Sequence, residues 1–264
     1  MATRVVALTI HDVVSDVSRE KRNGDSFYRI TLSDLEALLV RLRRLGYQTA
    51  TSREFREWQQ GQISLPERTV VLTFDDGHRS HIEQVAPLLV RYRFTGTFFV
   101  TAGQVGRAGY MNWEELRRLV FLGMEIGSHG LTHRPLTDLS RVQLQDELVN
   151  SKQILEEKLG VPIRSLAAPG GFWSRAVAQA VEQARYEAAW VSTIGTNGSE
   201  THPLALRRIV VHQPFSADRI VSMVEGWQPA FWWAANQQLL IRLLKRALGV
   251  YGYEQLKRRL VPNA

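Results

Sequence analysis

The 264-residue sequence contains no cysteine. This absence excludes disulfides, a thiolate nucleophile and cysteine ligands for a metal, and it is typical of a reducing compartment. The sequence also lacks any apolar run near the ~20 residues that a membrane-spanning helix needs. Its first apolar run, residues 5–10, is shorter than the ~7–15 residues of a signal-peptide core. We therefore expect a cytoplasmic protein.

Acidic residues are the scarcer charged class, with 26 Asp and Glu against 33 Lys and Arg, for a net charge of +7. Such a surplus attracts nucleic acid, anionic lipid or a phosphorylated substrate, or it marks an enzyme that is merely basic. No zinc-finger, RNA-binding or P-loop pattern accompanies it, so we do not expect a nucleic-acid partner. The hydrophobic fraction of 44% is sufficient for a globular core.

Short β-branched runs alternate with longer helical patterns along most of the chain. The runs that predict strands are 4–10, 69–74, 95–101, 124–128, 165–168, 188–192 and 205–211. The patterns that predict helices are 31–45, 79–92, 113–121, 140–159, 175–184 and 217–225. This alternation predicts a parallel α/β fold. A count of about seven strands favours a barrel, closed or incomplete, over an open sheet.

The composition changes near residue 227. We expect residues 1–226 to form the barrel domain and residues 227–264 to form a C-terminal helical appendage. Tryptophans and phenylalanine open that extension, and leucines then alternate with Arg242, Lys245 and Arg246. Such a helix either lies on a membrane surface as a peripheral contact or caps the bottom of the barrel.

Two adjacent carboxylates, Asp75 and Asp76, follow the predicted strand 69–74. Active sites of parallel α/β barrels form at this end of the strands. Two like charges side by side are costly unless something compensates them. A metal ion would do so, with one carboxylate as its ligand and the other as a base facing the substrate. The sequence Asp-Asp-Gly is equally typical of a solvated turn.

His129 and His133 follow the predicted strand 124–128, four residues apart. In a helical turn this spacing places both rings on one side, where they can bind a metal. A pair of this kind taken alone is more often structural or exposed. Together with an aspartate from the other strand end, it makes a set of two histidines and one carboxylate. Such a set leaves coordination positions open for water and substrate.

The motifs Thr-Phe-Asp-Asp-Gly (73–77) and Ser-His-Gly-Leu-Thr-His (128–133) resemble those of the polysaccharide deacetylase family, also known as the NodB homology domain or carbohydrate esterase family 4. The resemblance extends from about residue 4 to residue 226. It implies a distorted (β/α) barrel, usually seven-stranded, that removes an N-acetyl group from a sugar with the help of a divalent metal. Zinc is the first choice, and cobalt or nickel also suit the ligand set.

The resemblance also implies roles for single residues. Asp75 would be the general base, and Asp76 would bind the metal together with His129 and His133. The family's third motif, Arg-Pro-Pro-Tyr-Gly-like, reads Ala-Ala-Pro-Gly-Gly at 167–171.

Gly170 thus takes the position whose backbone N–H serves the oxyanion, and Ala167 replaces the arginine that steadies the base. We hypothesise that Arg208 supplies the missing cation and keeps Asp75 ionised. The alternative is that Arg208 is a surface residue at a strand end.

Four further polar positions are candidates. His212 falls where the family carries its catalytic acid, although the triplet is Val-Val-His instead of Leu-x-His. His11 and Asp12 follow the first predicted strand, as a similar pair does in several relatives, and either bind the substrate or form a plain polar loop. We expect His78 to line the pocket and His81 to lie on a helix surface.

The leading interpretation is a deacetylase acting on an N-acetylated sugar in a polysaccharide, an oligosaccharide or a lipid- or nucleotide-linked precursor. Two alternatives stay open. One is a metal-independent C–N hydrolase on the same fold that acts on a cyclic amide or ureide. The other is a non-catalytic carbohydrate-binding protein.

Overall fold

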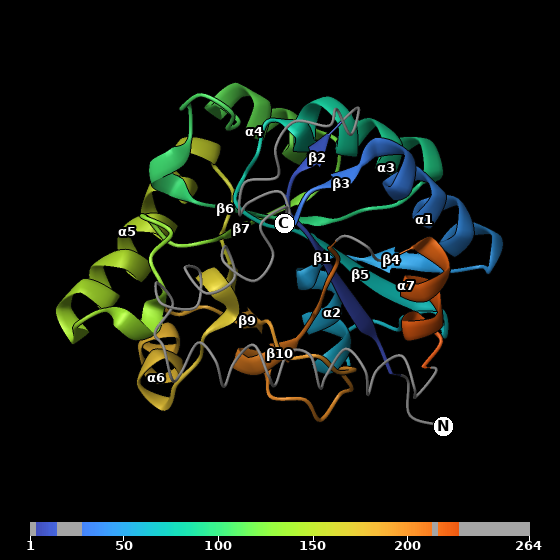
Figure 1. Cartoon of the computed structure of the whole chain (residues 1–264). Coiled ribbons are helices and arrows are strands. Elements are labelled where there is room, and N and C mark those ends of the chain that lie inside the picture. Colours follow the sequence, from blue (N-terminus) through green and yellow to red (C-terminus); the bar gives the residue numbers. More distant parts are fainter. Residues whose placement is uncertain (1–3, 15–27, 213–215, 227–264) are drawn as a thin grey trace, which may run out of the picture.

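The structure is a computed structural model that describes residues 4–14, 28–212 and 216–226 (Figure 1). Its centre is a parallel sheet in the order β10-β9-β8-β7-β6-β5-β1-β11, with β4 paired beside β5. Six strands form the middle of this path, and in chain order they are β1 (Val6–Ile10), β5 (Thr69–Phe74), β6 (Thr97–Val100), β7 (Glu125–Ser128), β8 (Ser165–Ala167) and β9 (Ala188–Val191). Each lies within or matches a strand that the sequence predicts.

One expectation needs correction where the sheet closes. The predicted strand 205–211 is two short strands, β10 (Leu206–Arg207) and β11 (Ile209–Val210). β10 pairs with β9, whereas β11 pairs with β1 at the opposite end of the sheet. Arg208 lies at the switch, and its backbone N–H donates to the carbonyl of Thr193 at 3.0 Å. The chain thus joins both ends of the sheet, and the predicted distorted (β/α) barrel is confirmed.

Helices cover the outside of this sheet as an arc (Figure 1). They are α1 (Leu32–Arg44), α3 (Ala86–Tyr92), α4 (Trp113–Phe121), α5 (Arg141–Leu159), α6 (Arg175–Gln183) and α7 (Ala217–Val224). Five of the six predicted helices agree with these bounds to within two residues. Side-chain caps explain that agreement, since Thr31, Asn112 and Ser140 each accept a hydrogen bond from the first turn of their helix.

The predicted helix 79–92 is the exception. It divides into a π-helical turn, η2 (His81–Val85), followed by α3. Pro87 cannot donate a backbone hydrogen bond, so a regular α-helix cannot continue through it. The N–H of Ala86 instead reaches back to the carbonyl of His81. This wide turn buries His81 completely, so the expectation of a surface histidine was wrong.

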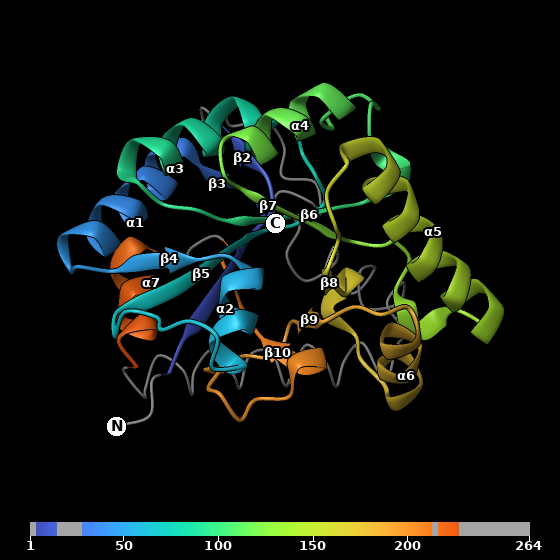
Figure 2. The same cartoon turned by 180° about the vertical axis from the view of Figure 1, so that it is seen from behind.

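Some elements escaped the sequence analysis. β2 (Val13–Val14) and β3 (Ile30–Thr31) form a separate pair, and β4 (Gln48–Ala50) lies beside β5. Helix α2 (Ser52–Gln59) lies inside the arc formed by the other helices (Figure 2).

Two apolar clusters divide the core. The larger fills the space between sheet and helices, and it includes Val70, Leu72 and Phe74 of β5. The smaller is inside the barrel, where Val71 meets Phe99, Trp190 and Phe55 of α2. Because β5 is covered on both faces, all six of its residues are buried, as its continuous apolar sequence predicts.

The C-terminal extension, residues 227–264, lies outside the described residues, so its predicted helix and membrane contact stay predictions. Among the residues that the structure describes, every helix is too short or too polar to cross a bilayer.

Candidate active site

The predicted site residues gather where the strands end. Asp75 and Asp76 follow β5, and His129 follows β7, two strands away across β6. Asp75 and His129 are each about 2% exposed. Because parallel strands bring their carboxyl ends to one edge, the two motifs meet at the mouth of the barrel.

Asp76, His129 and His133 form a compact cluster. Oδ1 of Asp76 is 3.3 Å from Nε2 of His129 and 3.0 Å from Nε2 of His133. One ligand atom from each residue lies within 4.8 Å of the others. The exposed fractions of the three side chains are 16%, 2% and 46%, so the cluster is open to solvent on the His133 side.

The backbone that presents these ligands is irregular. Asp76 has φ 75° and His133 has φ 66°. These values lie in the left-handed region, which residues other than glycine rarely adopt. Residues 129–133 form a loop without helical hydrogen bonding. The expectation that a helical turn aligns the two histidines was therefore wrong, although both rings do face Asp76. Left-handed residues of this kind cluster at functional sites, where the surrounding structure holds them.

The partner of His129 fixes its tautomer. Nδ1 of His129 lies 2.8 Å from the carbonyl oxygen of Ala167. A carbonyl only accepts, so Nδ1 carries the proton and the neutral ring leaves a lone pair on Nε2. That lone pair points at Oδ1 of Asp76, a buried oxygen that receives no hydrogen bond from the described residues. Two acceptors facing each other repel unless a proton or a metal ion lies between them, and the three residues together form a donor set that could hold a cation.

Asp75 lies beside this cluster and is paired with Arg208. Nη1 of Arg208 donates to Oδ1 of Asp75 at 2.7 Å, and Nη2 donates to Oδ2 at 2.9 Å. Arg208 is 1% exposed, so it is not a surface residue at a strand end. Burial alone would raise the pKa of Asp75, but the charge of Arg208 lowers it below its usual value. Asp75 is therefore ionised at neutral pH.

The inner wall of the barrel supports Arg208 from below. Its Nη1 also donates to Oγ1 of Thr73 at 3.2 Å, and its guanidinium lies 5.6 Å from the centre of the Phe99 ring. The hydroxyl of Thr73 in turn donates to the carbonyl of Leu8 at 2.9 Å. The guanidinium of Arg208 is thus held in one orientation by the strands that form the barrel.

Two histidines, His78 and His11, lie beside the aspartates, and a third, His81, contacts His11 from the core. Nε2 of His78 is 3.3 Å from Oδ2 of Asp76, and its ring stacks on Tyr110 at 5.2 Å. Burial lowers the pKa of His11, whose ring packs against Tyr28 at 5.0 Å. The carbonyl of His11 accepts a 2.6 Å hydrogen bond from Nε2 of His81.

The structure ties Asp12 into the fold. Its Oδ1 accepts a 2.8 Å hydrogen bond from the hydroxyl of Ser80, and its Oδ2 forms an ion pair with Arg29 at 3.1 Å. Asp12 therefore joins the loop after β1 to the segment that follows Asp76.

The remaining two candidates also lie at the mouth. Gly170 is exposed in a short turn after β8, with φ 66°. His212 is half-buried two residues after β11, and the N–H of Val211 donates to the carbonyl of Thr9 in β1. This register places His212 beside the end of β1, from which His11 projects.

The sequence analysis overlooked Glu147 on α5. Its carboxylate accepts hydrogen bonds from the loop between His129 and His133. A signal was present, since Glu147 interrupts the buried stripe formed by Leu144, Leu148, Ser151 and Leu155. A charged residue on the core-facing side of a helix is costly unless it has polar partners.

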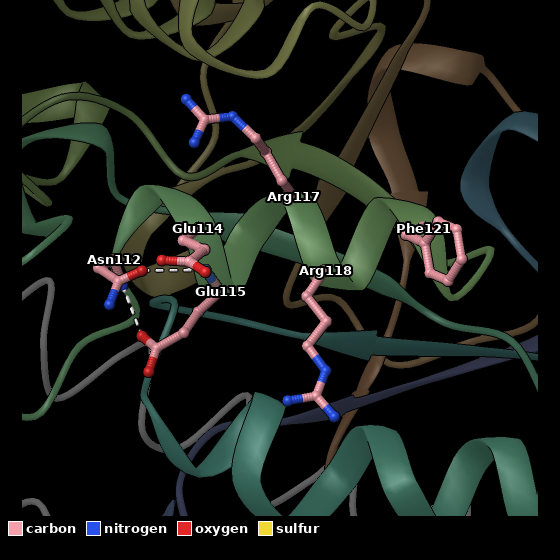
Figure 3. Close-up of a pocket in the computed structure, with 6 residues that line it drawn as sticks. All are labelled: Asn112, Glu114, Glu115, Arg117, Arg118 and Phe121. Carbon is pink, nitrogen blue, oxygen red and sulfur yellow. Dashed lines mark hydrogen bonds between the residues drawn. The ribbon is translucent and has the colours of Figure 1, made fainter.

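A hollow lies on the outer face of α4 (Figure 3). Its lining consists of Asn112, Glu114, Glu115, Arg117, Arg118 and Phe121. Asn112 and Glu115 are engaged in capping the helix, and Arg117 donates to the carbonyl of Lys158. None of the predicted site residues lines this hollow.

An ionised, buried carboxylate beside a candidate cation site, at the mouth of a parallel barrel, is an arrangement typical of hydrolases. Comparison with known proteins agrees. The family model described as polysaccharide deacetylase matches residues 62–189, which include both motifs. Residues 62–189, just under half of the chain, therefore match the polysaccharide deacetylase family.

Individual relatives support this assignment. A Bacillus subtilis protein named as a polysaccharide deacetylase, YxkH, is 24% identical over 204 residues, which cover 77% of this chain and 73% of that protein. The peptidoglycan-N-acetylglucosamine deacetylase of Bacillus cereus is 30% identical over 122 residues, 46% of this chain and 55% of that protein. The chain thus spans about half the length of the second relative.

Solved structures share the fold. The Streptococcus pyogenes deacetylase PplD, solved with acetate, has a TM-score of 0.78 and 19% identity, and the match covers 85% of this chain and 99% of that one. IcaB from Ammonifex degensii has a TM-score of 0.71 and 23% identity, with coverage of 89% and 98%.

Proposed function

We propose that this protein is a metal-dependent deacetylase that hydrolyses the N-acetyl group of an amino sugar in a glycan or in a lipid-linked glycan precursor. The names of its relatives support a glycan substrate. Besides the peptidoglycan enzyme, they include a poly-beta-1,6-N-acetyl-D-glucosamine N-deacetylase of Escherichia coli and a chitooligosaccharide deacetylase of Bradyrhizobium.

The observation that supports the proposed metal is the pair of facing acceptor atoms on Asp76 and His129. Together with His133 they would hold a divalent cation, most simply zinc, although cobalt and nickel accept the same ligands. When bound, the cation would supply Lewis-acid activation of water and of the acetyl carbonyl.

Asp75 supplies the base. Ionised and held by Arg208, it accepts a proton from the water that attacks the acetyl carbonyl. Because both of its oxygens are bonded to the guanidinium, its orientation is fixed before substrate arrives. This fixed orientation reduces the reorganisation that proton transfer requires.

Gly170 and His212 complete the proposed reaction. The backbone N–H of Gly170 stabilises the oxyanion that forms on the acetyl group, and the missing side chain lets substrate approach the backbone. His212 protonates the departing nitrogen, so that acetate and a free amino sugar are released. His78 and His11 border the space in which the sugar would lie.

The substrate class is tested by acetate release from a panel of peptidoglycan fragments, chitin oligomers, poly-N-acetylglucosamine and lipid-linked N-acetylated sugars. We expect release from at least one of these classes, and none from cyclic amides or ureides. Turnover of a cyclic amide with no acetate from any sugar would overturn the proposal.

We further propose that the basic C-terminal extension, residues 227–264, brings a cytoplasmic enzyme to the inner membrane face. Flotation with anionic liposomes should recover the whole chain but not a chain that lacks residues 228–264. Equal recovery of the two would contradict a membrane role for this segment.

A further inference from the structure

Glu147 is a buried anion beside the proposed metal site. It lies on α5 and is 5% exposed. Its Oε1 accepts hydrogen bonds from the backbone N–H of Leu131 at 2.8 Å and of Thr132 at 2.5 Å. The hydroxyl of Thr132 lies 3.1 Å from Oε1 and 3.0 Å from Oε2. All of these donors belong to the short loop that separates His129 from His133.

The same loop is bound on its opposite side by the segment after β6. The carbonyl of Gly130 accepts from the N–H of Ala102 at 3.0 Å, and that of Leu131 accepts from the N–H of Gly103 at 2.9 Å. The carbonyls of Gly130 and Leu131 thus bond to the segment after β6, and the amides of Leu131 and Thr132 bond to Glu147. The amide of Gly130 donates to the hydroxyl of Ser128. With no helical hydrogen bonds of its own, the loop depends on these external partners for its shape.

The shape is one that a free chain would rarely adopt. Gly130 has φ 76° and His133 has φ 66°, and a non-glycine residue in this region costs about 1–3 kcal/mol unless its surroundings enforce it. A Cβ at Gly130 would lie 2.9 Å from Oε1 of Glu147. The glycine therefore lets the loop close onto the carboxylate.

We propose that Glu147 is a positioning residue for the metal site. It holds the loop so that both imidazole Nε2 atoms face Asp76 before a cation binds. This inference rests on the proposed function, because it concerns the metal that the function requires. It goes further in assigning the geometry of the histidine pair to a residue that touches neither the cation nor the substrate.

The chain supplies a matched control on the same helix. Oε1 of Glu156 accepts a hydrogen bond from the backbone N–H of Ile163 at 2.9 Å, so this glutamate also holds a loop, but one away from the cluster. Glu147→Ala and Glu156→Ala each remove a carboxylate that binds backbone amides. Only the first should change the metal site.

The experiment measures zinc affinity of the full chain by competition with a chromophoric chelator, together with the visible spectrum of the cobalt form. We expect Glu147→Ala to bind zinc about 10–100-fold more weakly and to give an altered cobalt spectrum. Glu147→Gln, whose amide oxygen still accepts from the backbone, should recover much of the affinity. Glu156→Ala should match the wild type in both measurements.

Wild-type affinity and an unchanged cobalt spectrum in Glu147→Ala would overturn the inference while leaving the proposed function intact. If Glu147→Ala does not fold, Gly130→Ala decides, because its Cβ would lie 2.9 Å from Oε1 of Glu147 and so displaces the carboxylate without removing it. Wild-type zinc binding in Gly130→Ala would likewise count against the inference. A wild-type chain that binds no divalent cation would overturn the proposed function, and this inference with it.

Discussion

Arg208 donates one hydrogen bond to each carboxylate oxygen of Asp75, at 2.7 and 2.9 Å. The family resemblance places the steadying arginine at the end of β8, where this chain has Ala167. Here the arginine comes instead from the junction of β10 and β11, the point at which the barrel closes. The same charge therefore reaches the base from another strand. Ala167 keeps a different task, because its carbonyl orients His129.

The pH dependence of activity should reveal this pair. Arg208 lowers the pKa of Asp75 against the effect of burial. Removing the cation in Arg208→Ala leaves the burial, so the pKa of Asp75 should rise. The acidic limb of the profile of kcat/KM against pH should then move to higher pH, because the base is lost at a higher pH.

Arg208→Lys is the matched control, since it keeps the charge but loses the two-point contact. Its acidic limb should lie between those of the wild type and Arg208→Ala. An acidic limb that stays in place in Arg208→Ala would show that another group holds Asp75 ionised.

Substitution should distinguish the roles of the two neighbouring aspartates. Asp75→Asn removes the base and should lower kcat by about 10²–10⁴-fold, while metal content by elemental analysis stays at the wild-type level. Asp76→Asn should lose the metal, because it removes the carboxylate that faces both histidines. Loss of metal in Asp75→Asn, with retention in Asp76→Asn, would reverse the proposed roles.

A general acid matters most for a poor leaving group. We therefore expect His212→Ala to lower kcat on an N-acetyl sugar by about 10²–10⁴-fold. An aryl acetate, whose leaving group needs no proton, should be hydrolysed at nearly the wild-type rate. An equal loss on both substrates would indicate that His212 supports the fold or binds the substrate instead.

His81 should make the metal-free protein sensitive to acid. Burial lowers its pKa from 6.5 to about 4. Nε2 already donates to the carbonyl of His11, and the buried Nδ1 has no hydrogen-bond partner among the described residues. At a pH between these two pKa values, His81 is protonated in the unfolded chain but neutral in the folded chain. Stability is therefore unaffected above pH 6.5 and lost as the pH falls toward 4.

The expected loss from His81 is about 2 kcal/mol at pH 5. Urea unfolding of the chelator-treated protein at pH 7 and pH 5 measures it. His81→Gln, which keeps an N–H donor without a titrating group, should lose less stability over this interval. The same loss in the variant and the wild type would assign the acid sensitivity to other groups.

Local sequence patterns were sufficient to predict most of the strands and helices. The apolar sequence of β5 predicts a strand covered on both faces, and the bounds of α4 follow from its cap and its apolar spacing. The aspartates and His129 could be placed at one barrel mouth because each follows such a strand.

Two of the misses depend on contacts far apart in the sequence, and the third depends on a local turn geometry that periodicity does not reveal. The break at Arg208 depends on pairing with β9 on one side and β1 on the other. The burial of His81 depends on a π-turn ahead of Pro87. The loop between His129 and His133 takes its shape from Glu147 on another element. Periodicity within one segment contains none of this information.

The most direct test of metal-dependent deacetylation is acetate release by chelator-treated enzyme before and after one equivalent of zinc is added. The substrate is the N-acetylated sugar that the wild-type enzyme prefers, and Asp76→Asn is assayed in parallel. We predict that chelation abolishes acetate release and that zinc restores it in the wild type but not in Asp76→Asn. Full activity in metal-free protein, or equal restoration in Asp76→Asn, would contradict the proposed function.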